Sequence, residues 1–587
     1  MSWSRAAAIV LALAAMNWAH VGAQERTPEV CMALPGSPAC AAARSCQRAP
    51  TGRECRSGLE AQGFEAAQWA VQNDTAEAVA RVGARFAAQN TDLGRRVAAR
   101  EAAAARVKAL DGELVGALGR AEAGGQAELR ARLTAAQQEL RAADDFLAAQ
   151  YPAYQELARP KPLSIADTQT LLTRDEALVF YMVGPQTTYV WAITREATAW
   201  RRIPLGKAAL SEKIVALREG LDPDVVNAAL DAGRAPHFAF DVSRELYRLL
   251  VEPVAASLAG KSRVLIAPSG PLLGLPFAVL TASPPPAGAA ALADYKAARW
   301  FGTSKALTVL PAPSALRALR CPGGFRDNRC APRQGRPALE RPFIGVGAAR
   351  FNGLPAVLDA PTRDLVAACF FAPDAPTAAL ADQRCIPLLE PLPGSGQELS
   401  AIARDTNTAE GQGIFFGAAA TERQIKEMRL RANVIVLATH GLTAESGVRT
   451  GEAGLAFTVP ALQTPARAAS ALDDGYLTAS EAAQLSIAAD FVILSACDTA
   501  RGRKLDDDGL SGLARSFLYA GADALLVSHW PVADAAAVTL SPTVVAYSRR
   551  MDRAAALRLV MEEMLARARD VGDAHPAYWA PFELVGA

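Results

Sequence analysis

The sequence has few residues that bind metals through a side-chain nitrogen or sulfur. It has five histidines in 587 residues, and neither a CxxC pair nor an HxxxH pair occurs. A zinc site takes three or four ligands from such residues and carboxylates, and a thioredoxin-like motif needs the second cysteine of a CxxC pair. We therefore expect no metal and no other cofactor.

Signatures of nucleotide, nucleic-acid and serine-hydrolase chemistry are also missing. The glycines of SGPLLGL (Ser269–Leu275) are not followed at the right place by GK[ST], and no GxSxG elbow stands near the end of a predicted strand. The net charge is only +1. Because nucleic-acid binding relies on a basic surface, no nucleic-acid partner is expected from this balance.

Long apolar runs are missing except at the start of the chain. Arg5 precedes AAAIVLALAAMNWA, and VGA stands before Gln24. This pattern predicts a signal peptide over residues 1–23, cleaved near Ala23. An uncleaved anchor is the alternative, but the run is short for a bilayer span. We expect a periplasmic or secreted protein with no membrane contact after cleavage.

The nine cysteines take their meaning from this predicted export, because an oxidising compartment favours disulfides. Eight of them lie as close pairs in sequence: Cys31 with Cys40, Cys46 with Cys55, Cys321 with Cys330, and Cys369 with Cys385. The pairing itself is not fixed by the sequence. The count is odd, so at least one thiol is unbridged within the chain, and Cys497 has no close neighbour. An inert buried thiol is the simpler alternative for it.

Composition divides the mature chain into three predicted segments. Residues 24–58 are rich in Cys and Pro, and residues 59–158 are rich in Ala, Arg and Glu. In the second segment, Leu133, Leu140, Leu147 and Tyr154 recur every seven residues, and Gly124–Gln126 is a natural turn. This predicts an antiparallel helical hairpin. Its apolar stripes are most simply packing faces, with a protein activator as the alternative partner.

Residues 159–587 alternate between apolar strand-like runs and helical patterns, which indicates an α/β fold with a mainly parallel sheet. We divide this region into a first half, 159–340, and a second half, 341–587. Two runs in the second half end on reactive side chains. VIVLATHGL (Val434–Leu442) ends with His440 and Gly441, and FVILSACDTARG (Phe491–Gly502) contains Cys497.

The carboxyl ends of parallel strands gather catalytic loops, so His440 and Cys497 would meet if their strands are neighbours. An imidazole within reach of a thiol removes its proton or stabilises the thiolate. Backbone N–H groups at Gly441 and Cys497 could then hold a developing oxyanion. Together they form a minimal set for acyl transfer.

Several motifs together resemble the CHAT domain, a caspase-like family in the same clan as separases. They are ATHG, LSACDTARG, GLARSFLYAGADALLVSHWPVAD and HPAYWAPFELVG, with LYRLLVEPVAASL and APSGPLLGLPFAVL further upstream. The resemblance covers roughly residues 160–587. It implies a three-layer α/β/α sandwich and the chemistry of a cysteine peptidase.

The resemblance also implies roles for particular residues. His440 is the general base or thiolate partner, Cys497 the nucleophile, and Gly441 part of the oxyanion region. Asp498 either orients the loop, helps to line the specificity pocket or is a solvated loop acid. Trp530 and Trp579 match family aromatics that we interpret as packing residues first, with pocket lining as the lesser alternative; His529 and His575 are expected to be structural.

These features predict an exported cysteine endopeptidase that acts on a protein or peptide. A catalytically silent scaffold with a CHAT fold is the main alternative, and a non-proteolytic acyl transferase is a third. The loop Ala500–Leu510 carries three basic residues and three acids. We interpret it as a solvated loop, with a maturation segment cut after Arg501, Arg503 or Lys504 as the sharper hypothesis.

Overall fold

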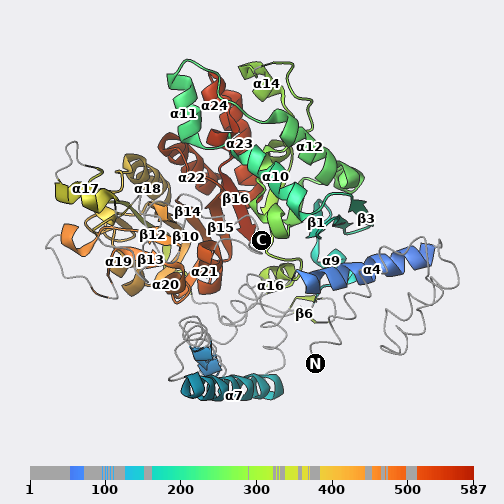
Figure 1. Cartoon of the computed structure of the whole chain (residues 1–587), viewed down its shortest axis with the longest axis horizontal. Helices are drawn as coiled ribbons and strands as arrows, with labels where there is room; N and C mark the ends of the chain where they lie inside the picture. The colour runs from blue at the N-terminus through green and yellow to red at the C-terminus, as the bar shows by residue number, and fades with distance from the viewer. Residues whose placement is uncertain are drawn as a thin grey trace. The chain divides into compact units, whose positions relative to one another are not determined.

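The computed structural model (Figure 1) describes most of the chain from residue 53 onward. The described residues are 53–71, 96, 99–100, 102–103, 106–107, 110, 126–150, 162–288, 290–321, 325–326, 329–330, 338–354, 360–367, 369, 384–442, 453–463, 470, 473–496 and 512–586. The predicted signal peptide, Cys497, Asp498 and the loop Ala500–Leu510 lie outside them.

The chain forms two compact units, which we describe separately. The first comprises Met1–Ala76, Pro162–Leu316 and Leu339–Ala587, and the second comprises Glu77–Lys161 and Arg317–Ala338. In the described part of the chain, no helix combines the length and the apolar character that a membrane crossing requires.

A single sheet of 11 strands forms the centre of the first unit. In spatial order its strands are β3 (Thr198–Ile203), β2 (Thr188–Thr194), β1 (Glu176–Val183), β4 (Arg263–Ala267), β5 (Ala306–Val309), β16 (Phe582–Gly586), β15 (Ala524–Ser528), β14 (Ile487–Ser495), β10 (Leu430–Ala438), β8 (Arg341–Ala349) and β9 (Ile414–Gly417). Neighbours are parallel except in the pairs β3–β2, β2–β1 and β16–β15. The predicted α/β class with a mainly parallel sheet is therefore confirmed.

The C-terminal strand joins the two halves of this sheet. Strand β16 pairs antiparallel with β15 on one side and parallel with β5 on the other. Strands β1 to β5 come from residues 162–316, and the remaining strands come from residues 339–587. The C-terminal strand therefore connects two halves of one sheet that come from separate parts of the sequence.

Helices cover both faces of the second half of the sheet. Helices α18 (Pro393–Thr406), α22 (Asp534–Ser548) and α23 (Arg553–Arg567) pack side by side, and α20 (Ala479–Ala482) packs on α21 (Gly512–Ala520). Figure 1 shows β10, β14 and β15 between the pair α18 and α22 on one side and the pair α20 and α21 on the other. This is the predicted three-layer sandwich. The other helices of this half are α17 (Ala360–Val366), α19 (Glu422–Glu427), α24 (Val571–Ala574) and α25 (Pro576–Trp579).

The first half of the sheet is accompanied by shorter helices. They are α9 (Ile165–Leu171), α10 (Lys207–Arg218), α11 (Pro223–Asp231), α12 (Phe240–Leu250), α13 (Ala255–Leu258), α14 (Leu292–Ala297) and α15 (Phe301–Ser304). Helix α16 (Ala315–Arg320) follows them in the chain.

Helix α4 (Arg53–Ala70) also packs in the first unit, although most of it falls in the segment predicted as a hairpin. Its Phe64 is buried and meets Phe180 edge-on, with ring centroids 5.8 Å apart. The Gln68 side chain accepts a hydrogen bond from the N–H of Leu163 (2.9 Å) and donates one to its carbonyl (2.8 Å). Helix α4 therefore forms part of the sandwich core, and the predicted segment boundaries stay predictions.

The second unit contains an antiparallel pair of helices. Helix α7 (Gln126–Gln150) pairs with the helical residues between 96 and 110 through Arg100–Asp144 (2.9 Å) and Arg106–Glu139 (2.6 Å). From the first pair to the second, the residue number increases on one helix (100 to 106) and decreases on the other (144 to 139). The two helices are therefore antiparallel. Leu133 of the predicted stripe is buried between the helices.

The second unit also contains a short hairpin of strands β6 (Phe325–Arg326) and β7 (Arg329–Cys330). A disulfide joins Cys321 to Cys330 beside it. This confirms one of the four predicted pairs. The pairs Cys31–Cys40 and Cys46–Cys55 lie outside the residues whose side chains are described.

Two glycines of strand β8 allow helix α18 to lie close to the sheet. A Cβ added to Gly347 would stand 2.5 Å from the Ala438 carbonyl oxygen and 2.9 Å from Leu399 Cδ1. One added to Gly345 would stand 3.1 Å from Leu399 Cδ2. Any larger residue would push α18 away from the ends of β8 and β10, where the candidate site lies.

Candidate active site

The strands that precede His440 and Cys497 in the sequence are neighbours in the sheet. Strands β10 and β14 run parallel with Ala438 opposite Ser495, and the Thr439 N–H donates to the Ser495 carbonyl at 3.2 Å. Both strands are almost wholly buried, as central strands of a parallel sheet should be. His440 follows the end of one strand, and Cys497 comes two positions after Ser495 in the sequence. Since Cys497 lies outside the described residues, the dyad itself stays a prediction.

His440 is half-buried and its ring is held in one orientation. Its Nε2 lies 2.7 Å from the backbone carbonyl oxygen of Glu390. A carbonyl only accepts hydrogen bonds, so Nε2 carries the hydrogen and Nδ1 has the lone pair of the neutral ring. The Phe351 ring meets the imidazole edge-on with centroids 5.0 Å apart. Nδ1 is therefore the atom of His440 that can take a proton.

Burial lowers the pKa of His440 below its ordinary value, and the Glu390 carbonyl opposes part of this shift by favouring the protonated ring. The imidazole is therefore mainly neutral at pH 7. A neutral ring with a free Nδ1 can act as a general base at that pH.

The Glu390 carbonyl is held by a well-connected loop. The N–H of Asn352 donates to the Pro387 carbonyl at 2.7 Å, and the N–H of Gly353 donates to the Leu389 carbonyl at 3.0 Å. Gly353 has a φ of 69°, and a Cβ there would stand 2.9 Å from Glu390 Oε2. The positive φ therefore favours glycine at this position, whereas the flexible end of the Glu390 side chain could move to admit a Cβ.

A disulfide fixes the start of the same loop. Cys369 and Cys385 are bridged and buried, and Cys385 immediately precedes the 3₁₀ turn Ile386–Leu388. This confirms the second of the predicted pairs that the described residues include. The bridge therefore anchors the segment that ends at the Glu390 carbonyl.

A small three-stranded sheet fixes the backbone on the other side of His440. It consists of β11 (Gly441–Leu442), β12 (Gly454–Ala456) and β13 (Tyr476–Thr478). The Ala456 N–H donates to the His440 carbonyl at 2.9 Å, and the Thr439 hydroxyl donates to the Ala456 carbonyl. Gly441 is buried and stands opposite Leu455 in this sheet. Its predicted oxyanion role stays a prediction.

Two buried hydroxyls hold the end of strand β14, and the sequence analysis missed both. Ser495 Oγ donates to Glu398 Oε2 at 2.9 Å, and Ser528 Oγ donates to the Ala496 carbonyl at 2.5 Å. A serine at the end of an apolar run, as in ILSA and LVSH, was the available signal. Glu398 was marked by its place on the buried face of an amphipathic helix.

The two predicted tryptophans are buried, whereas Asp498 lies outside the described residues. Trp530 is buried, and its indole N–H donates to the Ala577 carbonyl at 3.0 Å. Trp579 is buried and donates to the Ala574 carbonyl at 3.0 Å. These contacts are those of packing residues, and the lesser pocket-lining alternative for Trp530 stays a prediction.

The two histidines that we expected to be structural both have protein partners. His529 Nε2 lies 3.0 Å from Glu583 Oε2, and His575 caps α25, with its Nδ1 accepting from the Ala577 N–H at 3.2 Å. Burial lowers the pKa of His575 to about 4. His575 is therefore neutral at pH 7, as its acceptor role requires.

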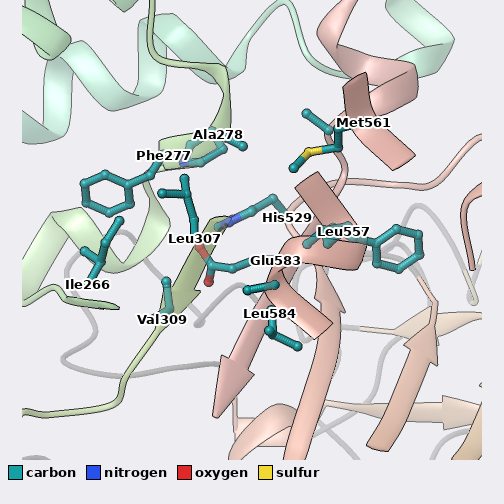
Figure 2. A pocket seen from close by; sticks show the side chains of 14 residues that line it. Ile266, Phe277, Ala278, Leu307, Val309, His529, Leu557, Met561, Glu583 and Leu584 are labelled. Atoms are coloured by element: carbon teal, nitrogen blue, oxygen red, sulfur yellow. Dashed lines mark hydrogen bonds and ion pairs between the residues drawn. The ribbon is translucent and has the colours of Figure 1, made fainter. Parts of the chain in front are cut away.

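Figure 2 shows a pocket that lies under helix α23, among residues of β4, β5 and β16. Apart from His529 and Glu583, which contact each other, its labelled walls are apolar. His440 is not among the lining residues. Within the described ranges, no group of three or more His, Cys, Asp or Glu side chains is placed to hold a metal ion. The His440 region is therefore the better candidate for chemistry.

The sandwich, with a histidine after one central strand and a cysteine-bearing segment after the next, defines a protein related to caspase-like peptidases. The CHAT domain family matches residues 241–587. The chain therefore belongs to the CHAT domain family, as its motifs predicted.

Curated relatives match only a short stretch. The chain is 35% identical over 111 residues to Tetratricopeptide repeat protein 28 of Mus musculus, covering 19% of this chain and 4% of that protein. The Homo sapiens protein of the same name is 32% identical over 116 residues, covering 20% and 5%. The chain thus spans about a twentieth of these relatives.

Among solved structures, two of the Saccharomyces cerevisiae separase–securin complex are similar, each at a TM-score of 0.37 and 9% identity. They cover 78% of this chain and 34% or 33% of the other. So low a score carries no argument about this chain.

Proposed function

We propose that the protein is an exported cysteine endopeptidase in which His440 and Cys497 form the dyad. The Cys497 sulfur attacks the scissile carbonyl as its proton passes to His440, and a tetrahedral oxyanion forms. The His440 proton goes to the leaving amine as the C–N bond breaks, which leaves a thioacyl-enzyme. Water, deprotonated by His440, then cleaves the thioester and restores the Cys497 thiol.

The observation that carries this proposal is the state of His440. Its Nε2–H is held by a carbonyl, its Nδ1 keeps a lone pair, and its lowered pKa leaves the ring neutral. It stands at the end of the strand next to the one that leads to Cys497. Membership of the CHAT family supports the same chemistry.

The substrate would be a protein or peptide, because the chemistry is acyl transfer from an amide. A protein activator could bind the helical hairpin of the second unit. Export and signal cleavage near Ala23 belong to the same proposal. The disulfides Cys321–Cys330 and Cys369–Cys385 support an oxidising compartment.

A thiol-reactive peptidyl probe tests the dyad. We expect the wild type to be labelled on Cys497, and Cys497→Ala to remain unlabelled. His440→Ala should lose on the order of 100-fold in labelling rate, the usual size of a general-base contribution. The exposed His237 provides a matched control, since His237→Ala should label like the wild type.

The alternatives give different outcomes in the same assay. A scaffold would show no labelling by probes of varied sequence, and His440→Ala would change nothing. A non-proteolytic acyl transferase would be labelled, yet a peptide library would be acylated rather than cut. Mass analysis of the library products separates hydrolysis from transfer.

A further inference from the structure

We propose that Glu398 is a positioning residue for the proposed dyad. Glu398 holds the end of strand β14 through a hydrogen bond to Ser495, and we infer that this fixes the position from which the chain continues to Cys497. The inference rests on the proposed function, because it concerns the geometry of that nucleophile. Glu398 acts through another residue, so it is not itself a catalytic residue.

Glu398 lies on the sheet-facing side of helix α18, together with Leu399 and Ile402. Its side chain is 1% exposed, and both apolar neighbours are fully buried. A buried carboxyl group is costly unless a donor meets it. Ser495 supplies such a donor, with its Oγ 2.9 Å from Glu398 Oε2. A packing role alone would have been served by another apolar residue at this position.

Ser495 connects this carboxyl group to the histidine strand. Its hydroxyl reaches Glu398, and its carbonyl accepts the N–H of Thr439, the residue before His440. From the opposite neighbour, β15, Ser528 donates to the carbonyl of Ala496. The two peptide units before Cys497 are therefore tied to β10, α18 and β15.

The segment 390–398 forms hydrogen bonds near the ends of both β10 and β14. The Glu390 carbonyl, just before α18, fixes the ring of His440. One turn before Glu398, the Ser395 hydroxyl accepts from the Ala348 N–H at 2.9 Å and donates to the Leu392 carbonyl at 2.7 Å. Residues 390–398 thus hold the ends of β8, β10 and β14 together.

The size of the expected effect follows from the protonation of the thiol, because only the thiolate is nucleophilic and a cysteine without a partner has a pKa of about 8.5. A thiol moved away from the imidazole of His440 would therefore be mostly protonated at pH 7. If the Ser495–Glu398 hydrogen bond is lost, Ser495 turns elsewhere and the segment leading to Cys497 loosens. The thiol would remain present but would be poorly placed against His440.

The test measures the alkylation rate of Cys497 in the full chain against pH. Iodoacetamide is the probe, and mass spectrometry follows the peptide that contains Cys497. We expect Glu398→Ala and Ser495→Ala each to slow alkylation at pH 7 by about 10- to 30-fold, because a smaller fraction of Cys497 would be thiolate. The double variant should be no slower than Glu398→Ala alone, because both substitutions remove the same hydrogen bond.

Glu398→Gln separates positioning from a general loss of packing. Its amide oxygen can still accept from Ser495, so alkylation should stay within about threefold of the wild type and keep its pH profile. Glu176→Ala is the matched control, because Glu176 is also buried but lies at the start of β1, where it accepts from the Thr173 N–H. This control should lower the melting temperature without slowing alkylation.

The outcomes distinguish this inference from the proposed function. If His440→Ala slows alkylation but Glu398→Ala and Ser495→Ala do not, the inference is wrong and the dyad stands. The inference is also wrong if the rate reductions of the two single variants multiply in the double variant, or if Glu398→Gln does not keep the alkylation rate near that of the wild type. If the wild-type thiol reacts with the pH profile of a free cysteine and His440→Ala leaves this profile unchanged, the proposed dyad is wrong. The positioning role of Glu398 is then wrong as well. Should Glu398→Ala not fold, Ser495→Ala and Glu398→Gln still decide the question.

Discussion

His440 shows at the scale of a single residue how a position in the fold selects a protonation state. The imidazole is half-buried, with Phe351 on one side and the Glu390 carbonyl at Nε2. Burial disfavours the charged ring and lowers its pKa, while the carbonyl favours a hydrogen on Nε2. The residue is therefore prepared to accept a proton on Nδ1 before any substrate arrives.

Replacing Phe351 by alanine should raise the pKa of His440 towards its ordinary value. The reason is that Phe351 is buried against the ring and its removal admits water. The C2–H resonances of the histidines, followed by NMR against pH, give this value directly. The His575 resonance is the internal control, because it should not move. A pKa of His440 that stays unchanged or falls would show that other groups cause the shift.

His575 provides a prediction about acid stability. Its pKa is lowered from 6.5 to about 4 by burial, so the folded protein binds this proton less tightly than the unfolded chain does. Its contribution to stability is complete above pH 6.5 and is lost as the pH falls through about 4. The full loss corresponds to about 3 kcal/mol, an order-of-magnitude figure.

The variant His575→Asn isolates this contribution, since asparagine can still cap the Ala577 N–H but does not titrate in this range. Chemical denaturation at pH 7 and at pH 4 should show a larger loss of stability in the wild type than in the variant. Equal losses in the two proteins would assign the acid sensitivity to other groups.

Sequence reasoning found His440 but missed the residues that hold it, and the reason is physical. His440 is marked locally, because it ends an apolar run and precedes glycine. Its partner Glu390 lies 50 positions away, and Glu398 lies 97 positions from Ser495. No local periodicity encodes such contacts, since they exist only once the sheet brings strand ends beside α18.

For the helices and strands around the site, features set by local sequence were also predicted, whereas features set by contacts between distant segments were not. Alternating strands and helices predicted the parallel sheet, because each βα unit buries its own apolar run. The position of β16 between β15 and β5 was not predicted, and neither was the small sheet β11–β13. Both depend on pairing between segments that the chain order does not place together.

The disulfide Cys369–Cys385 should matter to the site because of the element that it anchors. It fixes the turn Ile386–Leu388, which leads to the Glu390 carbonyl. We expect the variant Cys369→Ser/Cys385→Ser to slow alkylation of Cys497 by about tenfold, because a freer loop holds His440 less well.

The other described disulfide provides the matched control. Cys321–Cys330 closes a short hairpin in the second compact unit. Its double serine variant should alkylate Cys497 at the wild-type rate. If both pairs of substitutions slow the reaction equally, loss of a disulfide acts through general stability and not through Glu390.

At the scale of the whole molecule, the sheet joins two halves that meet along β5 and β16 and between helices of both halves. Strands β5 and β16 share only the pair Val309 and Val585 in their register. Helix α23 adds a second connection, because it packs on β5 and is N-capped by Asp552. Arg263, at the start of β4, reaches Asp552 Oδ2 through its Nη1 at 3.1 Å. This arginine therefore connects the first half of the sheet with a helix of the second half.

Arg263 also neutralises acids of the first half. Its Nε lies 3.1 Å from Asp175 Oδ2 and 3.6 Å from Glu176 Oε1, and Glu176 is 2% exposed. Hydrogen bonds from the Thr173 hydroxyl and from Arg263 hold the pKa of Asp175 well below its usual range. In the absence of Arg263, the buried carboxylate of Glu176 would lose the cation that offsets its charge and that of Asp175.

We therefore expect Arg263→Ala to destabilise the fold by about 1–3 kcal/mol, measured by chemical denaturation at pH 7. The control Arg567→Ala removes an arginine whose pair with Glu563 is largely exposed, and it should cost no more than about 0.5 kcal/mol. The halves also meet at other contacts, such as Trp300 edge-on against Trp579, with ring centroids 5.4 Å apart. Hydrogen exchange on peptides from β1 and β14 should therefore still give one opening free energy in Arg263→Ala. Equal costs for the two arginine variants would mean that Arg263 stabilises the fold no more than an exposed pair does.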